Sequence, residues 1–362
     1  MKQQSDIEMN QKYLEKKIRS VAGITQDHSG VFSLFFDLCS HLGREVLLLK
    51  AWANEVRVGI DDLEKKEFDA AIDSAHSFLE RNFNMAKSGA LYIKLGANPH
   101  VEEVLFDVPV ESQHYYKTYP VIYPLVELRD KFERFILVAT SSQKAHIAEI
   151  DLGRTSLEIV SMREDENMRT GREWTREHYS NVAKERGKKF LKEKVDILRK
   201  ITAQKGKSSI IIAGEPRYVN RLKEAMPKDL QALVVDEVRS GFSDNSLKDI
   251  IEKAQEAFLQ VEKTISLSAV DELVRTMHGS GLVAIGVDEC YKGLIWGNVQ
   301  NLVISKNMPS EDSEKLLKVA SVRKIPIETV EDSEKLEALG GVGAILRYRT
   351  PSEEMLNVKK AI

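Results

Sequence analysis

The chain has 362 residues, of which 42% are hydrophobic and 30% are charged, and this is the composition of an ordinary globular protein. The formal net charge of -3 excludes a globally basic nucleic-acid-binding protein, although a local basic surface stays possible. The amino terminus has no apolar segment and no apolar run approaches about 18 residues, so we expect a cytoplasmic protein without a signal peptide or a membrane span.

The residues that commonly hold metals or nucleotides show no recognisable spacing. Cys39 and Cys290 are far apart, and the 8 histidines are scattered along the chain. Both cysteines lie near apolar residues, which predicts buried and reduced thiols. The glycine-rich patterns GxGxxG and GxxxxGK[ST] are absent. We therefore predict no metal and no cofactor.

Residues 1–130 are predicted to form an amino-terminal α/β domain. Two stretches, 44–58 and 62–85, repeat apolar residues every three or four positions, which is typical of amphipathic helices. Runs of strand composition lie at 31–38, 89–95 and 104–108. Near the end of this domain Tyr115, Tyr116 and Tyr119 cluster, and packing at a domain junction is favoured over an aromatic patch for RNA.

Residues 131–266 are predicted to form a middle domain with ribonuclease-H-like order. Three strand-like runs, separated by turn residues, indicate an antiparallel meander. Helices and strands then alternate, and the apolar run at 208–214 is typical of a buried parallel strand. The strands are expected at 134–140, 144–150, 155–161, 208–214 and 232–238, and the helices at 174–201, 215–226 and 246–265.

Residues 267–350 are predicted to form a carboxy-terminal α/β/α sandwich, followed by a loose tail at 351–362. Strands and helices alternate, and Ser310 and Ser333 are expected to cap two of the helices. The helices are expected at 268–278, 288–295, 310–321 and 333–339, and the strands at 281–287, 299–305, 325–330 and 341–348. The fold class is therefore α/β with three domains.

The middle domain contains an unusually polar strand-to-helix connection, REDENMRTGREWTR, which runs from Arg163 to Arg176. Between Arg163 and Gly171 its one apolar residue is Met168, so it cannot be core. One interpretation is a plain solvated connector, since loops are polar by default. The other interpretation, a functional loop, depends on a resemblance in the rest of the chain.

Two segments of the third domain resemble a known family. GSGLVAIGVDECYKGLIWGNVQNLVIS and LGGVGAILRYR (339–349) are similar to the carboxy-terminal domain of archaeal and eukaryotic class I release factors and of Pelota. The middle domain has the order expected for the release-factor middle domain. In the first domain GALYIKLG, the Val108-Pro109 step and TYPVIYPLVEL look like bacterial relatives of these factors, including hibernation factors of the Balon kind.

The resemblance implies a position for the catalytic loop of the release factors. In those proteins this connection carries Gly-Gly-Gln, reaches the peptidyl-transferase centre and helps water to attack the peptidyl-tRNA ester. Here Gly171 matches, but Thr170 stands in place of a glycine and Arg172 in place of the glutamine. Threonine resists positive φ, and arginine has only hydrogen-bond donors. Hydrolysis by the release-factor mechanism is therefore not expected.

The same region is locally basic, with 12 Lys or Arg and 8 Asp or Glu between Arg163 and Lys200. Arginines on an extended loop suit RNA phosphates, whereas the alternative is a solvated helix face with mixed ion pairs. The predicted RNA-binding residues are Arg163, Arg169, Arg172, Arg176, Lys184, Arg186, Lys188 and Lys189.

Two functions from different classes follow from the resemblance. The first is a non-catalytic factor for ribosome rescue, hibernation or stress protection, with the ribosomal RNA of the A site as partner and with tRNA and a translational GTPase as further partners. The second is a peptidyl-tRNA hydrolase with a non-standard loop. A nuclease is not expected, because the first middle-domain strand lacks the carboxylates that two-metal chemistry requires.

Overall fold

The protein is described by a computed structural model that covers residues 10–24, 30–61, 64–96, 98–162, 176–205, 208–240, 247–279, 281–308 and 310–349. Its residues form two compact units: unit 1 comprises Met1–Phe132 and Lys263–Ile362, and unit 2 comprises Glu133–Glu262. Three sheets with flanking helices confirm the mixed α/β class. The division into three domains at 130 and 266 stays a prediction.

The amino-terminal part of unit 1 is built on a four-stranded antiparallel sheet of order β3-β2-β1-β4. Its strands are β1 (Val31–Asp37), β2 (Ser88–Lys94), β3 (His100–Phe106) and β4 (Gln113–Lys117). The helices are α1 (Gln11–Ala22), α2 (Leu42–Arg57), α3 (Lys65–Asn82) and α4 (Tyr123–Lys131). Strand β4 corrects the sequence analysis, which had no strand at the tyrosine cluster.

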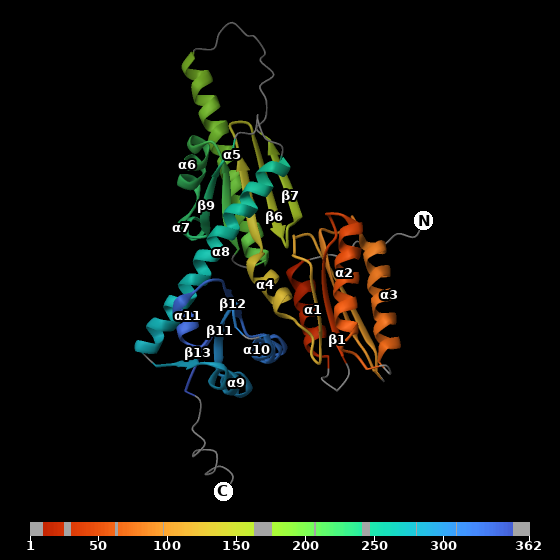
Figure 1. Ribbon diagram of the computed structural model, residues 1–362. Helices are drawn as coiled ribbons and strands as arrows, with labels where there is room; N and C mark the ends of the chain where they lie inside the picture. Colours follow the sequence, from red (N-terminus) through yellow and green to blue (C-terminus); the bar gives the residue numbers. More distant parts are fainter. Residues whose placement is uncertain are drawn as a thin grey trace. The chain divides into compact units, whose positions relative to one another are not determined.

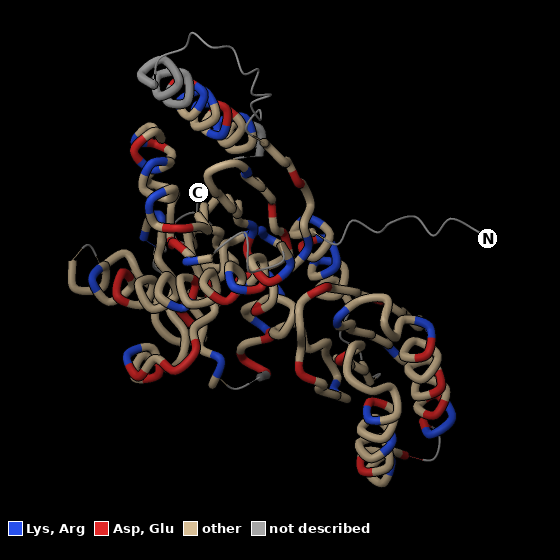
Figure 2. Tube along the Cα trace, turned by 90° about the horizontal axis from the view of Figure 1, so that it is seen from above, with Lys and Arg blue, Asp and Glu red and all other residues tan. Residues whose placement is uncertain are grey.

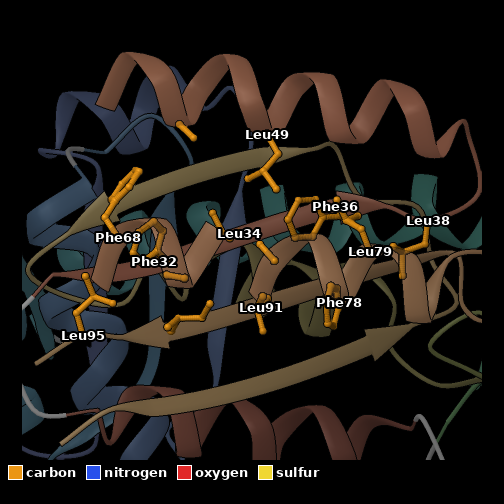
Figure 3. Close-up of a cluster of buried hydrophobic side chains, with 14 of the residues drawn as sticks. Phe32, Leu34, Phe36, Leu38, Leu49, Phe68, Phe78, Leu79, Leu91 and Leu95 are labelled. Carbon is orange, nitrogen blue, oxygen red and sulfur yellow. The ribbon is translucent and has the colours of Figure 1, made fainter. Parts of the chain in front are cut away.

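The core of this part lies between the sheet and the helices α2 and α3 (Figure 3). Successive strand side chains point to opposite faces, so Phe32, Leu34 and Phe36 of β1 share the face that meets these helices. Phe68 of α3 lies 5.1 Å from Phe32, measured between ring centroids. Tyr116 also packs here, against the core of the amino-terminal part and not at the domain junction that was predicted for the tyrosine cluster.

The carboxy-terminal part of unit 1 is an α/β/α sandwich around a four-stranded sheet of order β10-β13-β11-β12. Leu273 of α8 and Leu336 of α11 pack on one face, and Gly293 of α9 approaches Leu346 on the other. Its elements are the part of α8 (Leu247–His278) from Lys263 onward, β10 (Val283–Ile285), α9 (Val287–Trp296), β11 (Val299–Ser305), α10 (Ser310–Val322), β12 (Ile327–Val330), α11 (Glu334–Ala338) and β13 (Val342–Leu346).

Unit 2 is a five-stranded sheet of order β7-β6-β5-β8-β9, which is the ribonuclease-H-like order (Figure 1). Helices α5, α6 and α7 cover one face, and the first half of α8 covers the other. The elements are β5 (Phe135–Thr140), β6 (Lys144–Asp151), β7 (Arg154–Met162), α5 (Arg176–Lys205), β8 (Ser209–Gly214), α6 (Pro216–Ala225), α7 (Lys228–Gln231) and β9 (Val234–Arg239).

Two details of the sequence analysis are wrong. Helix α8 is continuous where two helices were predicted, because Ser268 donates its hydroxyl to the carbonyl of Thr264 within the helix and therefore does not cap a new one. Cys39 is exposed and only Cys290 is buried. Burial raises the pKa of the Cys290 thiol to about 12.

Candidate nucleic-acid interface

The polar connection predicted to be functional follows β7, which ends at one edge of the sheet of unit 2. Strand β6 is antiparallel to both β5 and β7, and β8 and β9 run parallel to β5. The strands β5, β7, β8 and β9 therefore all point the same way, and their carboxyl ends meet at one edge. Residues 163–175 connect the end of β7 at that edge to the start of α5. This edge is where open α/β sheets commonly place their ligands.

Four of the predicted residues, Arg163, Arg169, Gly171 and Arg172, lie outside the described residues. Arg176 and Lys184 belong to α5, but their side chains are also outside the described part. The remaining three predicted residues, Arg186, Lys188 and Lys189, lie together within five positions of α5. Their roles stay predictions.

Helix α5 is longer than its packed segment. It has 30 residues and therefore spans about 45 Å. Among its described side chains, which start at Glu185, the first buried one is Phe190, and burial continues through Val195, Leu198 and Ile201. The backbone before Phe190, residues 176–189, amounts to about 21 Å of helix. Among its described residues, 185–189, no side chain is buried.

The described part of this leading segment is basic (Figure 2). Lys188 and Lys189 are exposed, and Arg186 is half-buried. Lys188 Nζ lies 3.1 Å from Glu185 Oε1, but both side chains are more than two-thirds exposed, so this pair contributes little to stability and leaves the lysine accessible. The amino terminus of a helix carries partial positive charge, which adds to the attraction for phosphate.

Lys194 fastens α5 to the sheet edge. Its side chain is 1% exposed, and Nζ donates a 2.7 Å hydrogen bond to Thr140 Oγ1 at the end of β5. The ammonium also lies 3.8 Å from the centroid of the Phe190 ring. Burial lowers the pKa of Lys194 to about 8, and the nearby Glu193 acts in the opposite direction. An ammonium is thus held in a low-dielectric site by one hydroxyl and one ring.

Gly214 allows β8 to approach β5 closely at this edge. It pairs with Thr140 and has φ +155. A Cβ atom at this position would lie 2.4 Å from the Thr140 carbonyl oxygen. No residue with a side chain fits without a shift of the backbone. Thr140 is therefore contacted by Gly214 from β8 and by Lys194 from α5.

Helical spacing in the sequence predicts five buried positions in α5. One of them, Val182, has a side chain outside the described residues, and the other four are Leu191, Val195, Leu198 and Ile201. The last three are buried and Leu191 is half-buried. The sequence analysis missed Lys194, which was counted only as a basic residue. The spacing of four from Phe190 to Lys194 and from Lys194 to Leu198 was the available signal, because residues four apart share a helix face.

The structure offers no carboxylate cluster for metal-dependent chemistry in the described part of the chain. Glu149 is buried and lies 3.2 Å from Arg134 Nη1, and Glu158 lies 3.4 Å from His146 Nδ1. Both carboxylates therefore have protein partners. No helix formed by the described residues has the length and apolar character needed to cross a membrane.

A comparison with protein families finds a match to the part of the chain that contains the candidate interface. Residues 120–259 match the family model described as bacterial archaeo-eukaryotic release factor family 10. A Pelota homologue of Pyrococcus furiosus is 25% identical over 176 residues, which are 45% of this chain and 49% of that protein. A Pelota homologue of Methanosarcina barkeri is 24% identical over 323 residues, 82% of each chain.

The chain is similar to Pelota homologues and, over residues 120–259, to the bacterial archaeo-eukaryotic release factors of family 10. For two of the Pelota homologues, from Pyrococcus furiosus and Methanothrix thermoacetophila, the match spans about half of the relative's length, 49% in each case. Among solved structures, a ribosome-bound archaeal Pelota with ABCE1 is 16% identical, with a TM-score of 0.46 and coverage of 73% of this chain and 78% of that one. The family match over residues 120–259 includes β7 and α5 and therefore also the connection between them.

Proposed function

We propose that this Pelota-like chain is a ribosome-binding factor that directs residues 163–175 toward the peptidyl-transferase centre and does not hydrolyse peptidyl-tRNA. The observation that carries the proposal is the family match over 120–259, because it includes both β7 and the helix that follows this connection. The partner would be ribosomal RNA of the A site. Rescue, hibernation or stress protection of ribosomes would be the outcome.

The length and charge of α5 support this placement of the loop. Residues 185–189 of the helix have no buried side chain, so the basic residues among them can contact the RNA backbone without disturbing the core. Between Arg163 and Lys200 the 12 Lys or Arg outnumber the 8 Asp or Glu, although the whole chain has a net charge of -3. The segment therefore carries a local excess of positive charge that can attract RNA phosphates although the whole chain is slightly acidic.

The residue types in the loop argue against hydrolysis. Thr170 and Arg172 replace a glycine and the glutamine of the release-factor loop, and arginine offers no acceptor that could orient an attacking water. Gly171 is the one residue that matches, and it is the observation that favours the alternative function of a peptidyl-tRNA hydrolase with a non-standard loop.

Peptidyl-tRNA hydrolysis on purified ribosomes distinguishes the two functions. We expect no release above background from the wild-type chain. Release that is abolished by Gly171→Ala or Arg172→Ala would overturn the non-catalytic proposal and establish the alternative. A translational GTPase and tRNA are proposed as further partners, and co-sedimentation with and without a GTP analogue tests the GTPase.

Ribosome co-sedimentation tests the loop as a contact. We expect Arg169→Glu with Arg172→Glu to weaken binding and to flatten its dependence on salt, because each lost phosphate contact reduces the number of ions released on binding. Unchanged binding at low and moderate salt would contradict a role of the loop in binding. Circular dichroism of the variant controls for folding.

A further inference from the structure

Within unit 1, one carboxylate joins the carboxy-terminal part to the amino-terminal part. Glu314 of α10 accepts two backbone hydrogen bonds at the start of α4, from Ile122 N at 2.8 Å and from Tyr123 N at 3.0 Å. These amides belong to the first turn of a helix, where backbone donors lack intrahelical partners. Glu314 therefore caps a helix from a distant part of the chain.

The segment that Glu314 holds is also fixed from the amino-terminal sheet. Ser33 of β1 accepts a hydrogen bond from Val121 N at 2.9 Å, and Tyr92 of β2 donates one to Val121 O at 2.8 Å. The chain from Val121 to Tyr123 is thus held by its own sheet on one side and by Glu314 on the other. Loss of the Glu314 contact would weaken the docking of α10 on this segment and leave the two bonds from the sheet in place.

The Glu314 carboxylate is 5% exposed and makes these contacts without an ion pair among the described residues. Burial raises the pKa of Glu314 to about 7, against smaller effects of the amides of Ile122 and Tyr123 and of Lys117, which lower it. Three phenols lie around it, the buried Tyr92 and the half-buried Tyr115 and Tyr123, and burial raises the pKa of each.

Charged groups on the neighbouring elements make contacts of their own. On α4, burial raises the pKa of Asp130, whose Oδ2 accepts hydrogen bonds from the amide and the hydroxyl of Thr329. Lys318, one turn further along α10, donates to the carbonyl of Ile24 after α1. The charged residues of α9 are exposed, and among them Glu289 lies 3.3 Å from Lys292. Hydrogen bonds from Lys131 and Lys306 hold the pKa of Glu331 at about 2, so Glu331 stays ionised above pH 5.

We propose that Glu314 is a proton-sensitive latch that sets how firmly α10 is docked on the start of α4. The docked state favours the protonated carboxyl, because an ionised carboxylate released into water no longer bears the cost of burial. Docking is therefore strongest below about pH 4.5, weakens as the pH rises toward 7, and changes no further above that.

The experiment uses the full-length chain with Cys39→Ser to remove the exposed thiol. Spin labels at Lys50→Cys of α2 and Glu289→Cys of α9, both exposed positions, report the distance between the two parts of unit 1 at pH 5 and pH 8.5. We expect one narrow distance at pH 5 and a second population that grows about tenfold per pH unit up to pH 7. Glu314→Gln should remain docked at both pH values.

A matched control is Glu311→Gln, which removes an exposed carboxylate of the same helix. It should respond to pH as the wild-type chain does. If the second population is too small to observe, the ¹³C resonance of the Glu314 carboxyl decides. Titration near pH 7 supports the latch, whereas titration near pH 4.5, or a pH response that Glu311→Gln also abolishes, would overturn it.

Discussion

The buried ammonium of Lys194 and the hydroxyl of Thr140, 2.7 Å apart, fasten the long helix α5 to the carboxyl end of β5. Lys194 lies one helical turn after Phe190, which is the first buried residue among the described side chains of α5. The basic half of the helix precedes it. Lys194 thus sets the position from which the leading segment extends toward the connection at 163–175.

Because the pKa of Lys194 is lowered by burial, we predict that the free energy of unfolding changes with pH in the alkaline range. The pKa of Lys194 is about 8 in the folded chain against an ordinary 10.5, so between these values the unfolded chain binds more protons and stability rises with pH. Relative to Lys194→Met, the wild-type free energy of unfolding should increase by about 3 kcal/mol from pH 8 to 10.5.

Urea unfolding of unit 2, followed by circular dichroism, measures this difference. Lys192→Met, which changes an exposed lysine of the same helix, is the control and should show no such trend. A constant difference between wild type and Lys194→Met across this pH range would show that Lys194 is not buried as a charge.

Gly214→Ala should destabilise unit 2 by about 2 kcal/mol or more, because the new Cβ meets the Thr140 carbonyl in a backbone conformation that alanine rarely adopts. Gly187→Ala is the matched change at a helical glycine with open space around its Cβ position. It should stabilise α5 by roughly 1 kcal/mol. Thermal unfolding of both variants checks the contrast, and equal effects would contradict it.

Charge reversal of Lys188 and Lys189 should weaken ribosome co-sedimentation. We expect the slope of log affinity against log salt to fall by roughly one to two for this double change. Lys248→Glu with Lys253→Glu alters the net charge equally at exposed positions of α8 in the same unit. Equal losses of binding in the two variants would show that only overall charge matters.

Thr329→Val tests the contact between Thr329 and Asp130, which joins the two parts of unit 1 in addition to the Glu314 contact. Asp130 Oδ2 accepts hydrogen bonds of 2.6 Å from both the amide and the hydroxyl of Thr329. Removal of the hydroxyl leaves the half-buried carboxylate of Asp130 with one donor fewer, and should cost about 1 kcal/mol. Ser74→Ala on the exposed side of α3 is the control for the thermal unfolding measurement.

Much of the architecture was predictable from the sequence, because apolar periodicity directly determines which face of an element is buried. The strands of unit 2 appear where their composition placed them, and Ser333 caps α11 as expected. Helix α8 was not predictable as one element, since serine hydroxyls bond either as caps or within a helix.

The candidate site was less accessible from the sequence. Lys194 resembles any other lysine of α5, and its burial is decided by contacts with Thr140 and Phe190. Glu314 follows a helix start among Asp and Glu residues and reads as an exposed position. Its partners, Ile122 and Tyr123, are about 190 residues away, so only the tertiary fold brings them together.

Cryo-electron microscopy of ribosomes incubated with the full-length chain tests the central claim most directly. We predict density for unit 2 in the A site, with α5 directed so that residues 163–175 approach the peptidyl-transferase centre and Lys188 and Lys189 lie against ribosomal RNA. Density for the chain at another ribosomal site, or in the A site with this connection directed away from the peptidyl-transferase centre, would contradict it.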